Sequence, residues 1–234
     1  MTSSPDSIHS DQVVCVVPAR NEATVIGGVI GSLVGEGYRV LCVDDGSTDG
    51  TGEIARRAGA MVLTHPVNLG QGASLESGFE AIRRGLVDAR LVATFDADGQ
   101  HSTMDLAKMV EEFNRDPALM VTLGSRFLDK ATAVPRLKRT LLQLSAALAR
   151  FTIGVKVSDR HNGLRMMRSE ALASIRLKVP GYGHADEFLR AIRRHDLPFK
   201  EVPVHILYTD YSTSKGQPLI NAFRILFDHL IGGQ

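Results

Sequence analysis

Two aspartates stand one residue apart, directly after an apolar run, in "TFDADGQH" at residues 94–101. If a strand ends at Asp96, a turn can bring the carboxylates of Asp96 and Asp98 towards one point. Carboxylate oxygens are hard ligands that suit Mg²⁺ or Mn²⁺, usually with a substrate diphosphate, and Gln100 offers an amide oxygen beside them. The same letters also fit a polar turn that only stops a strand, because an acid-x-acid pair arises by chance in many turns.

The segments that would position this pair alternate between apolar, β-branched runs and helical patterns. Strands are expected at 13–18, 39–45, 60–65, 91–98 and 118–127, and helices at 22–34, 51–58, 70–85 and after a capping Ser102. This alternation indicates βαβ units and a mainly parallel sheet, which binds ligands at the carboxyl ends of its strands. The polar clusters "PARNE", "VDD" and "DAD" all fall at such ends, so we expect them at one edge.

The second half of the chain has a different pattern but no linker-like break before it. Helices are expected at 134–154, 184–198 and 218–233, with strands after a turn in 159–167 and at 199–209. We therefore predict a short disordered arm over 1–11 and a single domain over 12–234, in two halves of about 12–126 and 127–234.

Composition excludes several classes of protein. The 234 residues are 44% hydrophobic, enough for a sizeable core, and 27 Lys and Arg against 26 Asp and Glu give a net charge of +1, unlike a nucleic-acid binder. Cys15 and Cys42 lie in apolar runs and are expected to be buried thiols of a reduced cytoplasmic protein. No signal-peptide pattern and no apolar stretch approaching the ~18 residues of a membrane span is present, so we expect a soluble or peripheral protein.

The order of the motifs adds a resemblance to a known family. "VVPARNEATV", "VDDGSTDGT", "HPVNLGQGAS", "FDADGQH" and "GSRF" follow one another as in family 2 glycosyltransferases of the GT-A fold, and "DRHNGLRMM" and "YSTSKGQ" extend the likeness over roughly residues 12–220. Within that family the chain looks most like the dolichol- and polyprenyl-phosphate sugar synthases. The resemblance implies an α/β GT-A sandwich, with a mostly parallel central sheet flanked by helices, a donor half and an acceptor half.

The resemblance also implies a UDP- or GDP-sugar donor, a divalent cation (Mg²⁺ or Mn²⁺), a polyprenyl-phosphate acceptor and inverting transfer of a hexose. Carried over by position, the donor-binding residues would be Pro18, Arg20, Glu22, Val43, Asp45, Gln71, Asp96, Ala97, Asp98 and Lys215. Asp96, Asp98 and Gln100 would approach the metal, and Lys215 would close over the diphosphate. Arg126 would meet a phosphate, and Arg139 would match the Arg that holds the acceptor phosphate.

Departures from the family pattern bear on the acceptor rather than the donor. Gln71 stands where the polyprenyl group commonly has a Lys, which removes one cation from the pocket. Thr209 stands where an Arg is usual, six residues before the loop Lys, and Gln143 stands where a Ser is common.

The acceptor decides whether a base is needed. A phosphate monoester is already an anion at neutral pH and needs cations more than it needs a base, whereas a sugar or lipid hydroxyl would need a general base. Asp186 in "HADEF" is the candidate base for that alternative, and it equally fits a helix-start acid favoured by the macrodipole.

Two other classes fit less well. A nucleotidyltransferase would carry a Gly-rich, Lys- or Arg-bearing signature after the first strand, and "PARNEATV" lacks it. Intact Asp96, Asp98 and Arg126 argue against a non-catalytic nucleotide-sugar sensor. We therefore expect an enzyme of cell-envelope glycan synthesis that is cytoplasmic and peripheral at the inner face of the membrane. A membrane-embedded partner protein and a homo-oligomer both remain open.

Overall fold

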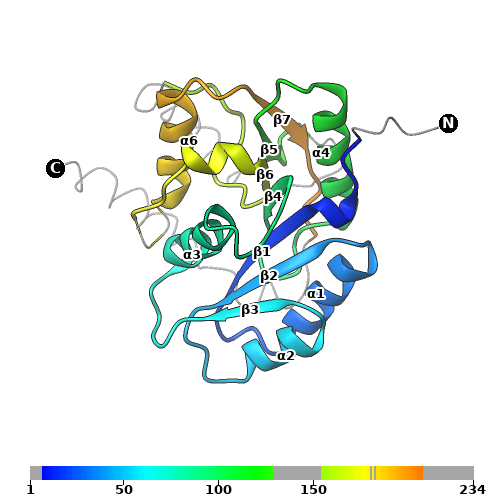
Figure 1. Ribbon diagram of the computed structural model, residues 1–234, viewed down its shortest axis with the longest axis vertical. Helices are drawn as coiled ribbons and strands as arrows, with labels where there is room; N and C mark the ends of the chain where they lie inside the picture. The colour runs from blue at the N-terminus through cyan, green and yellow to red at the C-terminus, as the bar shows by residue number, and fades with distance from the viewer. Residues whose placement is uncertain (1–6, 129–153, 180, 182, 208–234) are drawn as a thin grey trace.

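The computed structural model describes residues 7–128, 154–179, 181 and 183–207, and a single seven-stranded sheet runs through them (Figure 1). Across the sheet the strands are β3 (Met61–Thr64), β2 (Arg39–Asp44), β1 (Val13–Ala19), β4 (Leu91–Thr94), β6 (Arg165–Arg168), β5 (Val121–Ser125) and β7 (Phe199–Pro203). β6 runs antiparallel to β4 and β5, and the other neighbouring pairs are parallel. The sheet is therefore mostly parallel, as expected, with one reversed strand.

Helices cover both faces of the sheet. On one face lie α1 (Ile26–Gly35), α2 (Thr51–Arg57) and α4 (Thr103–Arg115), and on the other lie α3 (Gln71–Arg83), the 3-10 helix η2 (Ser169–Ala173) and α6 (His184–Arg194) (Figure 1). Each layer has its own hydrophobic cluster, so the sheet is buried from both sides. This burial explains why "VVCVV" of β1 is a continuous apolar run, the pattern of a central parallel strand.

Local sequence sets the start of α4, whereas the turn before α1 is held by residues distant in the sequence. The hydroxyl of Ser102 accepts from the N–H of Met104 and caps α4, as predicted. The helix predicted from residue 22 begins only at Ile26. The N–H groups of Glu22 and Ala23 donate to the side chains of Thr51 and Asp49, which ties this turn to the start of α2, and the N–H of Ile26 donates to the carbonyl of Glu22.

The start of the described chain packs on the domain. Ile8 is buried, and its N–H and carbonyl are both hydrogen-bonded by the side chain of Asn114 on α4. A second 3-10 helix, η1 (Ser10–Gln12), leads directly into β1. Residues 7–12 of the predicted arm and its junction therefore have defined contacts, and the one-domain boundaries stay a prediction.

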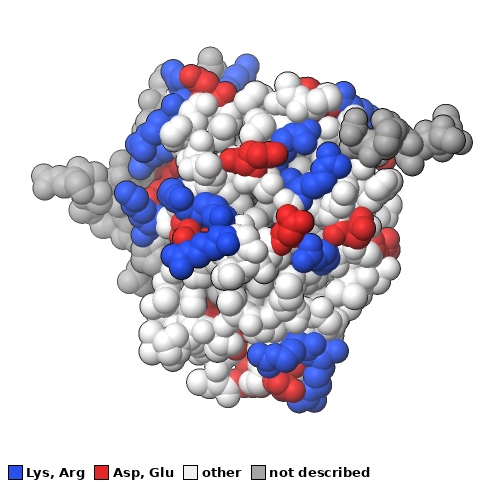
Figure 2. All heavy atoms as spheres, in the orientation of Figure 1, with Lys and Arg blue, Asp and Glu red and all other residues white. Residues whose placement is uncertain are grey.

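Several predicted segments lie outside the described residues, namely the helices at 134–154 and 218–233 with Arg139 and Lys215. Among the helices that the structure describes, none has the length and apolar character to cross a membrane. On the face shown in Figure 2, basic and acidic side chains interleave over the described residues without a broad patch of one sign.

Candidate functional site

The carboxyl edge of the sheet collects segments from both halves of the chain. β1, β2, β3 and β4 all end there. Because β6 is reversed, the chain enters it at the same edge: Thr94, the last residue of β4, pairs with Arg165, the first of β6. The hydroxyl of Thr94 donates to the carbonyl of Gly163 over 2.5 Å. The turn predicted within 159–167 therefore lies beside the acid pair.

Asp96 is held at this edge by side chains from two directions. Its Oδ1 accepts from the amide of Gln71, at the start of α3, over 3.1 Å, and its Oδ2 lies 3.1 Å from Nε2 of His101. Burial opposes ionisation, but the hydrogen bond and charge of His101, with the charges of His184 and Arg165, leave the pKa of Asp96 below its ordinary value. The carboxylate is thus ionised and fixed in orientation.

Asp98 meets Asp96 in an environment rich in negative charge. Its Oδ1 accepts from the N–H of Gln100, which closes the turn after β4. Burial, followed by the charge of Asp96 and more weakly that of Glu22, raises the pKa of Asp98 above its ordinary value. The surroundings of Asp98 therefore disfavour its negatively charged form.

The acid pair fits a divalent cation by its chemistry. A cation between Asp96 and Asp98 would relieve their repulsion, and two carboxylates give the oxygen ligands that Mg²⁺ and Mn²⁺ prefer. Within the described ranges, no group of three or more His, Cys, Asp or Glu side chains forms a ready cage. The remaining ligands must therefore come from elsewhere, such as the amide oxygen of Gln100 or a diphosphate.

The two loops that were predicted to line a nucleoside pocket are hydrogen-bonded together. Asn21, with φ of 53°, accepts from the N–H of Thr48 and donates its own N–H to Ser47. The neighbouring Glu22 N–H donates to the hydroxyl of Thr51. Arg20, on this loop, is exposed. The "PARNE" and "DDGSTDGT" segments therefore form one fixed wall at the edge.

Asp45 lies on the same wall and braces the next loop. Its carboxylate accepts from the N–H groups of Leu69 and Gly70 over 2.8 and 2.7 Å, and from Nδ1 of His65 over 2.8 Å. Burial opposes its ionisation, but these hydrogen bonds and the charge of His65 lower the pKa of Asp45. Asp45 therefore orients the segment that presents Gln71 to Asp96.

The remaining residues that were predicted to bind the donor, Pro18, Val43 and Ala97, lie in or against the hydrophobic core beneath these loops. Pro18 is half-buried and pairs with Val43 in the neighbouring strand, and Val43 is fully buried in the cluster under α3. Ala97 is buried in the opposite cluster. In this structure these side chains support the loops around the site.

Two arginines near the edge, Arg126 and Arg160, are held in ion pairs with buried aspartates. Arg126, just after β5, donates from Nε to Asp159 over 2.6 Å. Arg160 donates to both carboxylate oxygens of Asp186 at the start of α6, from Nε over 2.5 Å and from a terminal amino group. Arg160 and Asp186 are about 95% buried. Asp186, the candidate base, is therefore half of an internal ion pair.

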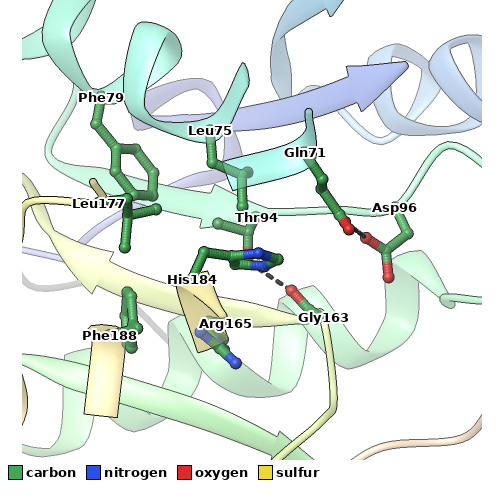
Figure 3. Close-up of a pocket in the computed structure, with 10 residues that line it drawn as sticks. All are labelled: Gln71, Leu75, Phe79, Thr94, Asp96, Gly163, Arg165, Leu177, His184 and Phe188. Atoms are coloured by element: carbon green, nitrogen blue, oxygen red, sulfur yellow. Dashed lines mark hydrogen bonds between the residues drawn. The ribbon is translucent and has the colours of Figure 1, made fainter. Parts of the chain in front are cut away.

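A small hollow lies between the two halves, directly beside Asp96 (Figure 3). Its volume of about 10 Å³ admits roughly one water molecule. The guanidinium of Arg165 lies 4.7 Å from the ring centre of Phe188, and burial lowers its pKa to about 10, so it stays charged. The lining residues are Gln71, Leu75, Phe79, Thr94, Asp96, Gly163, Arg165, Leu177, His184 and Phe188.

The structure thus gathers most of the predicted site along one edge. Asp96, Asp98, Gln71 and Gln100 form its centre, whereas Arg139 and Lys215 lie outside the described residues. Four further polar side chains at the edge, His101, Arg160, Arg165 and His184, were not among the predicted site residues. Their positions in the motifs could have identified them, because His101 ends "DADGQH", both arginines lie in "DRHNGLRMM", and His184 begins "HADEF".

Comparison with known proteins gives a consistent set of relatives. A family model described as glycosyl transferase family 2 matches residues 14–176. The UDP-N-acetylglucosamine–dolichyl-phosphate N-acetylglucosaminyltransferase of Methanococcus voltae is 28% identical, over 91% of this chain and 92% of the relative. The dolichyl-phosphate hexose transferase of Haloferax volcanii is 33% identical over 70% of each chain. The polyprenol monophosphomannose synthase of Mycolicibacterium smegmatis is 27% identical, over 86% of this chain and 78% of the relative.

Solved structures share the fold at low identity. Glucosyl-3-phosphoglycerate synthase from Mycobacterium tuberculosis, in complex with Mn²⁺ and uridine-diphosphate-glucose, superposes with a TM-score of 0.70 at 21% identity. The match covers 94% of this chain and 78% of that one. Together with the mostly parallel sheet and its helices, this likeness confirms the predicted GT-A fold.

Proposed function

Because this chain belongs to glycosyl transferase family 2, we propose that it transfers a hexose from a UDP- or GDP-sugar to a polyprenyl phosphate, with Mg²⁺ or Mn²⁺. That the chain is a glycosyltransferase, as its motifs predicted, follows from the family. The choice of acceptor is supported by the relatives, whose names specify dolichyl or polyprenol phosphate chemistry.

The observation that carries the proposal is the pairing of acids and cations at one edge. Asp96 and Asp98 follow β4, and the guanidinium groups of Arg126, after β5, and of Arg160, before β6, lie at the same edge. An anionic acceptor must approach an anionic diphosphate, so cations at their meeting point lower the repulsion between them. A hydroxyl acceptor would instead need the Arg160–Asp186 ion pair to open before Asp186 could accept a proton.

In the proposed reaction, an acceptor phosphate oxygen attacks the anomeric carbon while the bond from that carbon to the nucleoside diphosphate breaks, which inverts the configuration. A divalent cation, when bound, neutralises charge on the leaving diphosphate. Asp96 and Asp98 would hold it, with Gln100 beside them. Arg126 is placed to meet a phosphate, because no described residue accepts from its two terminal amino groups. We also propose that Arg139 holds the acceptor phosphate and that Lys215 contacts the diphosphate.

The donor part is tested by a thermal-shift panel of nucleoside diphosphates with and without Mn²⁺. We expect one nucleotide to raise the melting temperature, and to do so only with the metal, because a ligand that binds the folded state stabilises it. Asp98→Ala should abolish this metal dependence, and the exposed Asp88→Ala serves as the matched control. Full metal-dependent activity in Asp98→Ala would overturn the assignment of the acid pair.

The acceptor part is tested by two lipids that differ in one group. A polyprenyl phosphate, the free polyprenol of equal chain length and a soluble glycan are each offered with a radiolabelled donor, and label is counted in the organic phase and in the aqueous glycan fraction. Transfer to the phosphate alone is expected. Transfer to the polyprenol, or only to a soluble glycan, would replace the proposal with hydroxyl transfer. With a lipid acceptor, we also propose peripheral association with the inner face of the membrane, which fractionation of cells would test.

A further inference from the structure

His101 is a buried side chain that the proposed reaction has not yet used. Its imidazole is 4% exposed and packs edge-on against Phe95, with ring centres 5.4 Å apart at 66°. Its backbone forms an isolated antiparallel bridge with Ile206. The ring is therefore held by its packing against Phe95, and the backbone that carries it is held by the bridge to Ile206.

The hydrogen bond from this ring has a defined direction. Nε2 of His101 lies 3.1 Å from Oδ2 of Asp96, and an ionised carboxylate can only accept. Nε2 must therefore carry the proton. The other nitrogen, Nδ1, is buried and has no hydrogen-bond partner among the described residues. A buried polar atom left without a partner costs stability, so packing alone does not explain a histidine here.

Asp96 is oriented by donors on both of its oxygens. Gln71 donates to Oδ1 and His101 to Oδ2, each over 3.1 Å. Gly163 approaches from a third side, where a Cβ would lie 2.8 Å from the carboxyl carbon. A carboxylate has about four lone-pair sites, so two accepted hydrogen bonds leave positions that can still bind a cation.

We propose that His101 is a positioning residue for the donor site, whose Nε2–H fixes the Asp96 carboxylate in the orientation that binds the divalent cation. The inference rests on the proposed function. It assigns no contact between His101 and the metal or the sugar. Residues that hold a ligating carboxylate in place typically change metal affinity by roughly 10- to 100-fold when they are removed.

Two substitutions separate the hydrogen bond from packing. His101→Phe keeps a flat ring against Phe95 but removes the donor, whereas His101→Gln keeps an amide N–H at about the reach of Nε2. The apparent dissociation constant for Mn²⁺ is measured by titration calorimetry in the presence of the stabilising nucleoside diphosphate, and the melting temperature without metal is recorded. The exposed His195→Phe is the matched control.

We expect His101→Phe to raise the apparent Mn²⁺ constant by roughly 10- to 100-fold, with His101→Gln and His195→Phe close to the wild type. If His101→Phe fails to fold, His101→Asn replaces it, because its shorter amide cannot reach Asp96. A folded variant without the donor that melts earlier but binds Mn²⁺ like the wild type would show a structural role only and overturn the inference. A wild type that does not respond to Mn²⁺ would overturn both this inference and the metal in the proposed function.

Discussion

Gly163→Ala tests whether the second half must leave room for Asp96. A Cβ at residue 163 would lie 2.8 Å from the carboxyl carbon of Asp96, whereas ordinary van der Waals contact begins at 3.4 Å. Gly163 does not have a positive φ, so the added methyl group is resisted by this contact and not by the backbone. The carboxylate, which Gln71 and His101 hold from the other sides, must therefore shift.

The expected cost follows from the size of that shift. The nearer oxygen of Asp96 must move by about 1 Å, and a misplacement of that size at a reacting centre costs about 100-fold in rate, or roughly 2.7 kcal/mol. Overpacking should also lower the free energy of unfolding by roughly 1–3 kcal/mol. The assay is kcat/KM for sugar transfer at saturating Mn²⁺, with urea unfolding in parallel.

The control for this substitution is Gly28→Ala on α1, where an added Cβ meets nothing within 4 Å. It makes the same chemical change away from the site, and it should leave activity unchanged while raising stability slightly. Activity of Gly163→Ala within twofold of the wild type would refute the reasoning, because Asp96 would then tolerate displacement or have no part in transfer.

Two further predictions concern stability. The folded pKa of Asp45 lies below its ordinary value of 3.8, so its contribution to the free energy of unfolding is present above that value and is lost as the pH falls through the folded pKa. In urea titrations at several pH values, the stability of Asp45→Asn should therefore fall less on acidification than that of the wild type. An equal fall in both proteins would contradict the assignment. Asp186→Ala should cost roughly 3–5 kcal/mol in urea unfolding, since it breaks a buried ion pair. Glu111→Ala, which breaks an exposed pair with Arg115, should cost under about 1 kcal/mol, and similar values for the two would count against the buried pair.

The parts of the fold that depend on local pattern were predictable. The hydroxyl of Ser102 and the apolar spacing after it define α4, and the apolar run of β1 indicated a strand covered on both faces. The gathering of polar clusters at one edge also followed, because parallel strands share their carboxyl end. These features depend on residues close together in sequence or on a general rule of topology.

The remaining features depend on partners far along the chain. The direction of β6 is not encoded in "RMMR", since a four-residue strand pairs either way and its neighbours, β4 and β5, decide. The hydrogen bonds that Thr51 and Asp49 accept from the N–H groups of Glu22 and Ala23, in the turn before α1, join residues 29 and 26 positions apart. The role of Asp45 in bracing a loop involves backbone N–H groups, which no side-chain motif reveals.

The reversed strand also orders the events of folding. Gln71 and Asp96 are separated by 25 residues, whereas the Thr94–Gly163 hydrogen bond spans 69. During synthesis from the N-terminus, the donor-side support of Asp96 can therefore form well before the chain that supplies Gly163 has emerged. Closing the longer loop carries the greater entropic cost, so we expect the wall contributed by residues 159–164 to complete the site late in folding.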